Sequence, residues 1–247
     1  MNRFEFHHLF NTKGPVILPV IHVIDRGQTA ANIDKLVHAG ISGCFLINHD
    51  FDVATFLPII RSIRSRYPDF WIGINFLAVT GLEAFPVLAL LERDGFRIDA
   101  YWGDDARIDE RTDDQPEAEA ISKTRVESGW KGLYFGGTAF KKQRPVNPDD
   151  YATSAHIAGG YMDVVTTSGI ATGNAAEISK IATFRSALPD TPIALASGIT
   201  PENAEDYRMV DCFMVATGIN IDNDFYNIDP AKLHQLMLRC QEMEDQI

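Results

Sequence analysis

Short apolar stretches recur along the chain, and the longer segments between them carry apolar residues at every third or fourth position. Nearly continuous hydrophobicity predicts strands that are buried on both faces, as in a parallel sheet, whereas the wider spacing predicts amphipathic helices. The predicted strands cover residues 15–23, 42–48, 70–77, 97–103, 132–137, 162–169, 192–198 and 211–218.

The predicted helices alternate with these strands. In the segment TPENAEDYRM, Thr200 is predicted as the N-cap and Pro201 as the first helical residue, because both residue types favour those positions. The predicted helices cover residues 29–40, 52–68, 80–95, 113–129, 147–160, 172–189, 200–209 and 229–243.

This alternation predicts a fold of the α/β class. Eight strand–helix units of about 30 residues each match a closed (β/α)8 barrel in number and length, and we expect one such domain over residues 1–247. The alternative is an open doubly wound sheet. It is less favoured because no GxGxxG motif follows the first strand.

Charge and cysteine content narrow the range of partners. Asp and Glu number 34 against 22 Lys and Arg, and a net charge of -12 repels the phosphate backbone of nucleic acid. The three cysteines are widely spaced without a CxxC motif, which fits a reducing cytoplasm. No apolar run approaches the ~20 residues that span a bilayer, so we expect a cytoplasmic protein without integral membrane association.

Polar side chains follow several of the predicted strands, at the end where a barrel of this kind builds its active site. Candidates for acid–base or electrostatic chemistry are His22, Asn48, Asp50, Asn75, Asp104 and Lys141.

Lys141 and His22 each allow two interpretations. Lys141 lies in KKQR, a basic cluster in an acidic protein, where burial would fit it for acid, base or Schiff-base chemistry. A solvated loop explains the same residues. His22 lies inside an apolar run, where a packed, hydrogen-bonded ring is a more common role than catalysis.

Two neighbouring strands end in similar glycine corners, ALASG and MVATG. The loops after the last strands of such barrels often bind phosphate, because glycine lets backbone N–H groups approach an anion closely. Tight turns alone would also explain these glycines. The predicted phosphate site comprises Ser168, Gly169, Ser197, Gly198, Thr217 and Gly218.

The segments TSGIATG, SGITPENAEDY and VATG, together with NHDFD and GINFL, resemble the BtpA/SgcQ family of barrel proteins over most of residues 15–239. The resemblance implies a phosphate-binding barrel, with links to photosystem assembly in some members and sugar metabolism in others. Lys141 matches the family's segment after the fifth strand, whereas AVTG at 78–81 replaces a more polar run.

These observations lead to two hypotheses of different classes. The first is an enzyme that acts on a small phosphorylated metabolite, such as a sugar phosphate or phosphoribosyl compound, by isomerase, lyase or transferase chemistry. We expect neither a metal nor a cofactor, because no strand end carries an HxH motif or a compact carboxylate cluster. The second is a non-catalytic assembly or regulatory protein that retains the anion site. Whether the chain forms a homo-oligomer is left open.

Overall fold

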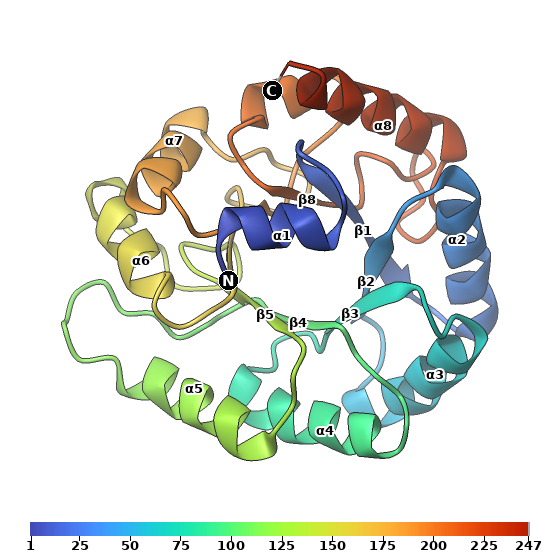
Figure 1. The fold of residues 1–247 in the computed structure, drawn as a ribbon, viewed down its shortest axis with the longest axis horizontal. Coiled ribbons are helices and arrows are strands. Elements are labelled where there is room, and N and C mark those ends of the chain that lie inside the picture. The colour runs from blue at the N-terminus through green and yellow to red at the C-terminus, as the bar shows by residue number, and fades with distance from the viewer. Residues whose placement is uncertain (247) are drawn as a thin grey trace.

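Eight parallel strands pair in chain order, and the last strand returns to the first (Figure 1). The computed structural model describes residues 1–246. Pairs such as Val16 with Cys212 join the two ends of the sheet, so the predicted (β/α)8 barrel is confirmed and the open sheet is excluded. The strands are β1 (Val16–Val23), β2 (Gly43–Asn48), β3 (Trp71–Asn75), β4 (Ala100–Gly103), β5 (Leu133–Gly137), β6 (Val164–Thr167), β7 (Ile193–Leu195) and β8 (Cys212–Val215).

Helices surround the barrel, and several begin where the side chain of an N-cap residue accepts a backbone hydrogen bond. Asp25, Asp52, Thr80 and Asp229 all do so. The helices are α1 (Arg3–Leu9), α2 (Arg26–Ala39), α3 (Val53–Arg66), α4 (Gly81–Arg93), α5 (Pro116–Ser128), α6 (Tyr151–Ala158), α7 (Ile178–Ala187) and α8 (Pro230–Glu244), with 3-10 turns η1 (Pro148–Asp150) and η2 (Ala204–Tyr207).

The α-helix predicted over residues 200–209 is wrong. Its place is taken by a turn and by η2, so Thr200 does not cap an α-helix. The side chain of Asn203 accounts for the difference, because its Oδ1 accepts from the Thr200 N–H at 2.8 Å and its Nδ2 donates to the Gly198 carbonyl at 2.8 Å. Such local side-chain bonds compete with helix formation.

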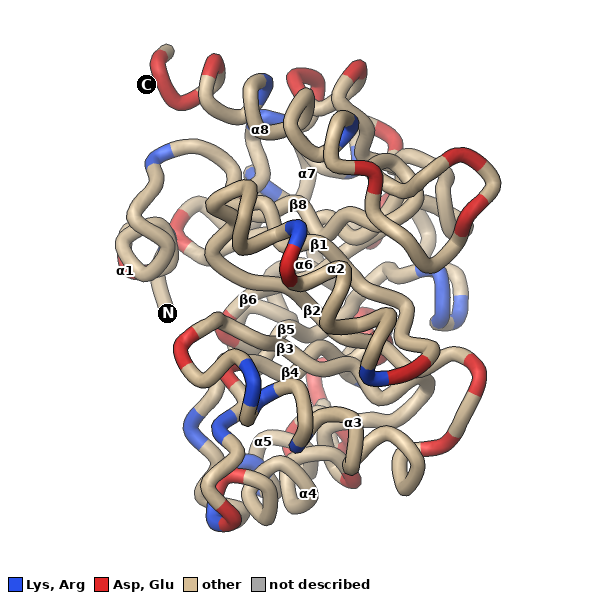
Figure 2. Tube along the Cα trace, turned by 90° about the vertical axis from the view of Figure 1, so that its right-hand side faces the viewer, with Lys and Arg blue, Asp and Glu red and all other residues tan. Residues whose placement is uncertain are grey.

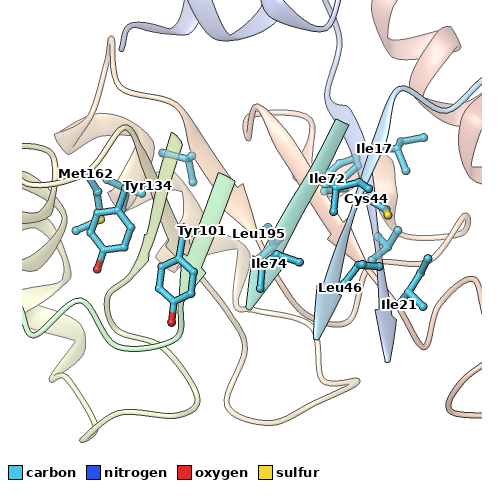
Figure 3. Close-up of a cluster of buried hydrophobic side chains, with 14 of the residues drawn as sticks. Ile17, Ile21, Cys44, Leu46, Ile72, Ile74, Tyr101, Tyr134, Met162 and Leu195 are labelled. Carbon is cyan, nitrogen blue, oxygen red and sulfur yellow. The ribbon is translucent and has the colours of Figure 1, made fainter. Parts of the chain in front are cut away.

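Two layers of apolar side chains bury both faces of the strands. Ile17 and Ile21 of β1, with Cys44 and Leu46 of β2, belong to the cluster between strands and helices (Figure 3). Alternate residues such as Leu18 belong to the cluster inside the barrel. In Figure 2 the charged residues lie on helices and loops, while all eight strands consist of uncharged residues. This two-sided burial accounts for the continuous apolar runs in the sequence.

Helix α1 closes the amino end of the barrel, and the sequence patterns above did not predict it. Asn2 and Glu5 form a capping box at its start. Phe6 and Phe10 then pack into the interior cluster, with ring centroids 6.2 Å from Phe135 and 5.4 Å from Trp71, respectively. In Figure 1 this helix crosses the barrel.

Asp211 joins α1 to the barrel floor. Its Oδ1 accepts from Arg3 Nε at 2.7 Å and lies 2.9 Å from His7 Nε2, while Oδ2 accepts from Arg185. Burial alone would raise the pKa of Asp211, but the His7 hydrogen bond and the Arg185 charge lower it to about 2. The carboxylate therefore stays ionised at neutral pH and binds three elements together.

The structure bears on the expectations about membrane-spanning segments and about the cysteines. Among residues 1–246, no helix is both long and apolar enough to cross a membrane. Cys44, Cys212 and Cys240 are free and buried.

Candidate functional site

A cavity of about 50 Å³ opens at the carboxyl ends of the strands. Its volume is several times the roughly 10–15 Å³ that one water molecule needs. It brings together three of the predicted side chains, His22, Asp104 and Lys141, and the glycine corners of β7 and β8. The lining comprises Val20, His22, Ile47, His49, Leu77, Trp102, Asp104, Lys141, Lys142, Thr172, Gly173, Ala196, Ser197, Gly198, Ile199, Met214, Val215, Ala216, Thr217 and Gly218.

Lys141 extends from the loop after β5 into this cavity. Its Nζ donates one hydrogen bond, to the Ala196 carbonyl at 3.0 Å, and no carboxylate of residues 1–246 forms an ion pair with it. Burial lowers its pKa to about 8, although the charge of Asp104 acts in the opposite direction. The neighbouring Lys142 is exposed. The two lysines of KKQR thus occupy different environments, and only Lys141 has the environment of a reactive amine.

Asp104 lies on the same cavity wall, 5% exposed. Burial raises the pKa of its carboxyl group, against the effect of a hydrogen bond from Asn75 Nδ2 to Oδ1 at 3.1 Å. The other amide atom, Asn75 Oδ1, is buried without a partner in the described part of the chain. A raised pKa makes this carboxylate a better proton acceptor than an ordinary aspartate.

His22 ends β1 beneath the loop that leads to α8. The Phe225 carbonyl accepts a hydrogen bond from its Nδ1 at 3.0 Å, and the two rings stack with centroids 3.8 Å apart. A proton held on Nδ1 leaves the lone pair on Nε2 as an acceptor. Burial, with the nearby His49, lowers the pKa of His22 to about 4, so the ring is neutral at pH 7.

The predicted glycines have a packing role that the sequence did not reveal. A Cβ on Gly218 would lie 1.9 Å from the Ile199 carbonyl oxygen, and a Cβ on Gly198, at φ +67°, would lie 2.2 Å from the Ala175 nitrogen. Gly169 would meet the Asn174 carbonyl oxygen at 2.2 Å. The three loops after β6, β7 and β8 thus pack backbone against backbone, and the glycines are required whether or not an anion binds.

Hydroxyl groups in these loops serve the protein itself. Ser197 donates to the Ala171 and Asn174 carbonyls at 3.0 and 2.6 Å, so its hydroxyl holds the loop after β6. Ser168 donates to the Gly169 carbonyl and accepts from the Lys141 N–H. The backbone N–H groups of Gly198, Thr217 and Gly218, by contrast, have no acceptor among residues 1–246.

Asn48 and Asp50 do not line the cavity. Asn48 donates to the Phe51 carbonyl at 2.6 Å and accepts from the Leu77 N–H at 3.1 Å, which connects the loops after β2 and β3. Asp50 accepts from the Tyr226 hydroxyl at 3.0 Å. Both predicted site residues therefore make bonds that stabilise the rim.

Lys180 of α7 is a buried cation that sequence reasoning missed. Its Nζ donates to the carbonyls of Ala139 and Ser168 at 2.5 and 2.8 Å, and burial lowers its pKa to about 8. The only signal was a lysine within a predicted helix, and its two acceptors come from different loops. Trp102 also lines the cavity, and its buried Nε1–H has no acceptor in the described structure.

Groups of three or more His, Cys, Asp or Glu side chains that could hold a metal ion are absent from residues 1–246.

No family model matches the chain, and no curated protein matches it. Solved structures do. The chain is similar to (S)-3-O-geranylgeranylglyceryl phosphate synthase from Thermoplasma acidophilum in complex with sn-glycerol-1-phosphate, at 16% identity and a TM-score of 0.67, over 97% of this chain and 98% of that one.

Two further structures give the same picture. The tryptophan synthase alpha chain from Legionella pneumophila subsp. pneumophila matches at 14% identity and a TM-score of 0.65, over 98% of both chains. Phosphoribosyl anthranilate isomerase from Thermus thermophilus matches at 16% identity and a TM-score of 0.58, over 92% of this chain and 98% of that one. At these identities the likeness shows the (β/α)8 fold, and none of these three structures gives evidence specific to the BtpA/SgcQ family.

Proposed function

We propose that the protein is an enzyme that acts on a small phosphorylated metabolite, a sugar phosphate or phosphoribosyl compound, by isomerase, lyase or transferase chemistry. The observation that carries the proposal is the position of Lys141, a partly buried amine without an ion-pair partner in the described chain, in the same cavity as the glycine corners. Similar barrels include a synthase in complex with sn-glycerol-1-phosphate and an isomerase of a phosphoribosyl compound, which supports this substrate class.

The phosphate group would bind at the ends of β7 and β8. The N–H groups of Gly198, Thr217 and Gly218 lack acceptors among residues 1–246, and these three residues line the cavity. Free backbone N–H groups in a loop bind anions without any positively charged side chain. The ammonium form of Lys141 would add attraction for the same anion.

Proton transfer would come from side chains that line the same cavity. Asp104, whose pKa is raised by burial, is suited to act as an acid, and Lys141, whose pKa is about 8, as a base or an electrostatic partner. The neutral His22 would accept a hydrogen bond from a substrate hydroxyl at Nε2. A phosphate anchor holds the reacting carbon in place relative to these groups.

Amide NMR spectra of the 15N-labelled protein test the binding site directly. Titration with glycerol phosphate should shift the resonances of Gly198, Thr217 and Gly218, whereas glycerol at the same concentration should not. Gly40 and Gly95 are matched controls, because both have positive φ and open space around them. The proposal fails if the control glycines move as much as the three loop residues, or if none moves.

The second candidate is a non-catalytic assembly or regulatory protein of the BtpA type. It is favoured by the bonds of Asn48, Asp50 and Ser197, since these polar groups stabilise the loops rather than face a ligand. It predicts the same amide shifts without turnover. In either case we propose a single-domain protein of the cytoplasm, where buried free thiols stay reduced.

A further inference from the structure

Three lysines near the barrel mouth differ in what their amines contact. Lys142 is exposed, and Lys180 donates to two main-chain carbonyls. Lys141 is partly buried, lines the cavity and donates to one carbonyl only, at 3.0 Å. Of the three, Lys141 therefore combines a water-poor position with a nitrogen that is open to a ligand.

A buried acid lines the same cavity as this amine. Asp104 lines the same cavity and is held by Asn75, yet no hydrogen bond or ion pair joins it to Lys141. An amine and a carboxyl group of raised pKa that share a cavity, with no hydrogen bond or ion pair between them, are the groups needed to condense an amine with a carbonyl compound.

We propose that Lys141 forms a Schiff base with the carbonyl carbon of a phosphorylated aldehyde or ketone, while Asp104 supplies and recovers the protons. The inference rests on the proposed function and names its substrate class. It narrows the chemistry to reactions that break a C–H or C–C bond next to an iminium carbon.

The proposed step is balanced as follows. The lone pair of Nζ adds to the carbonyl carbon as the C=O π bond breaks, and the oxygen takes the proton of the Asp104 carboxyl group. The new N–C bond leaves nitrogen with an extra proton, which returns to the carboxylate and gives a carbinolamine. Asp104 then protonates the hydroxyl group, water leaves, and the nitrogen lone pair forms the C=N bond of the iminium ion.

The environment of Lys141 supports a useful amount of nucleophile at neutral pH. With a pKa of about 8, roughly a tenth of the amine is neutral at pH 7, against well under a thousandth of an ordinary lysine. Lys180 has a similar pKa, but its two carbonyl acceptors hold its protons inward. Lys180 is therefore an internal control for a buried amine that two carbonyls hold in place.

Reductive trapping tests the proposal. The protein is incubated with D-glyceraldehyde 3-phosphate or dihydroxyacetone phosphate and sodium cyanoborohydride, and adducts are located by intact-mass and peptide mass spectrometry. We expect one adduct per chain, at Lys141, in the wild type and in Lys142→Met, and none in Lys141→Met. Labelling should be half-maximal near pH 8. Its rate should be at least tenfold lower when unphosphorylated glyceraldehyde replaces the phosphorylated probe, and at least tenfold lower when inorganic phosphate is added as a competitor.

Two variants separate the roles of charge and acid. Lys141→Arg keeps the positive charge but cannot form the imine, so it should bind phosphate and show no adduct. Asp104→Asn should slow adduct formation at least tenfold and leave the phosphate-induced shifts of Gly198 and Gly218 in place.

The outcomes distinguish this inference from the function on which it rests. If the two phosphorylated probes shift the amides of Gly198 and Gly218 but label Lys141 no faster than Lys142 or Lys180, the Schiff base is ruled out and the phosphate site stands. If they neither shift those amides nor label Lys141, both proposals are rejected.

Discussion

Asn75 Nδ2 donates a hydrogen bond to Asp104 Oδ1 across the ends of β3 and β4, and both side chains are buried. This contact lowers the pKa of Asp104 against the larger effect of burial, which raises it. The hydrogen bond from Asn75 thus keeps the pKa of Asp104 below the value that burial alone would give it.

Replacement of Asn75 by Leu should raise the pKa of Asp104 further, because it removes the hydrogen bond and keeps the carboxyl group buried. The pKa is measured from the 13C chemical shift of the carboxyl carbon. Asp52, an exposed N-cap residue, is the control and should titrate alike in both proteins. An unchanged pKa of Asp104 would show that the contact has no electrostatic effect.

Removal of the Lys141 charge should reduce turnover of the identified substrate about a hundredfold. This corresponds to roughly 3 kcal/mol, the usual loss for one well-placed electrostatic contact in a water-poor site. Lys141→Met keeps most of the apolar stem, and Lys142→Met is the matched control because that side chain is exposed. Equal loss in both variants would assign the effect to the loop rather than to the amine.

The same variant should not lower stability at neutral pH. Burial of Lys141 lowers its pKa from 10.5 to about 8, so the folded state binds fewer protons than the unfolded state between these pH values, and its stability rises with pH there. Below pH 8 the charged amine lowers the free energy of unfolding by on the order of 3 kcal/mol. The hydrogen bond to the Ala196 carbonyl offsets part of this loss. We expect Lys141→Met to unfold at equal or higher urea concentration at pH 7.

The advantage of Lys141→Met should fade as the pH rises from 8 to 10.5, where the wild-type amine becomes neutral in both states. Lys180→Met is the comparison, because it removes a donor from two carbonyls and leaves that of Ser168 without one among residues 1–246, whereas the Ala139 carbonyl still accepts from Thr167. It should be less stable than Lys141→Met at pH 7. A reversed order would show that Lys141 stabilises the fold.

Substitution of Gly218 tests loop packing. In Gly218→Ala the new methyl group would meet the Ile199 carbonyl oxygen at 1.9 Å, so the loops after β7 and β8 must separate. We expect loss of phosphate binding in calorimetry together with a fall in melting temperature. Gly40→Ala has a strained φ of +81° but no neighbour within 4 Å, so it should cost about 1 kcal/mol and leave binding intact.

Acid should destabilise the protein partly through His22. Its pKa falls from 6.5 to about 4 on folding, so the unfolded state binds the extra proton between these values and stability falls as the pH is lowered from 6.5 to 4. The full effect is on the order of 3 kcal/mol. His22→Gln lacks a titrating ring, so urea unfolding at pH 7 and pH 4.5 should show a smaller loss for the variant. An equal loss would assign acid sensitivity to other groups.

The strands and the barrel could be predicted because their signal is local. A strand buried on both faces must be apolar throughout, and runs such as 15–23 and 42–48 closely match β1 and β2. The prediction of an α-helix at 200–209 was wrong because the Asn203 side chain forms hydrogen bonds with the backbone of Thr200 and Gly198. Residue preferences alone do not distinguish this turn from an α-helix.

The candidate site was predictable only as a set of strand ends. Strand order placed His22, Asp104 and Lys141 around one cavity. Strand order gave no information on the directions of side chains. The sequence therefore did not reveal that Asn48 and Ser197 donate hydrogen bonds to neighbouring backbone carbonyls. Lys180 was missed because its acceptors, Ala139 and Ser168, meet only in the folded chain.

Helix α1 seals the end of the barrel opposite the cavity, and Met1 at its start is 40% exposed. A tether joined to residue 1 would therefore hold the molecule by its closed end and leave the open mouth facing solution. Ligand screens with the protein attached to a surface can use this orientation, because the linker then lies away from the cavity. The tether must leave the contacts of Arg3 and His7 with Asp211 intact.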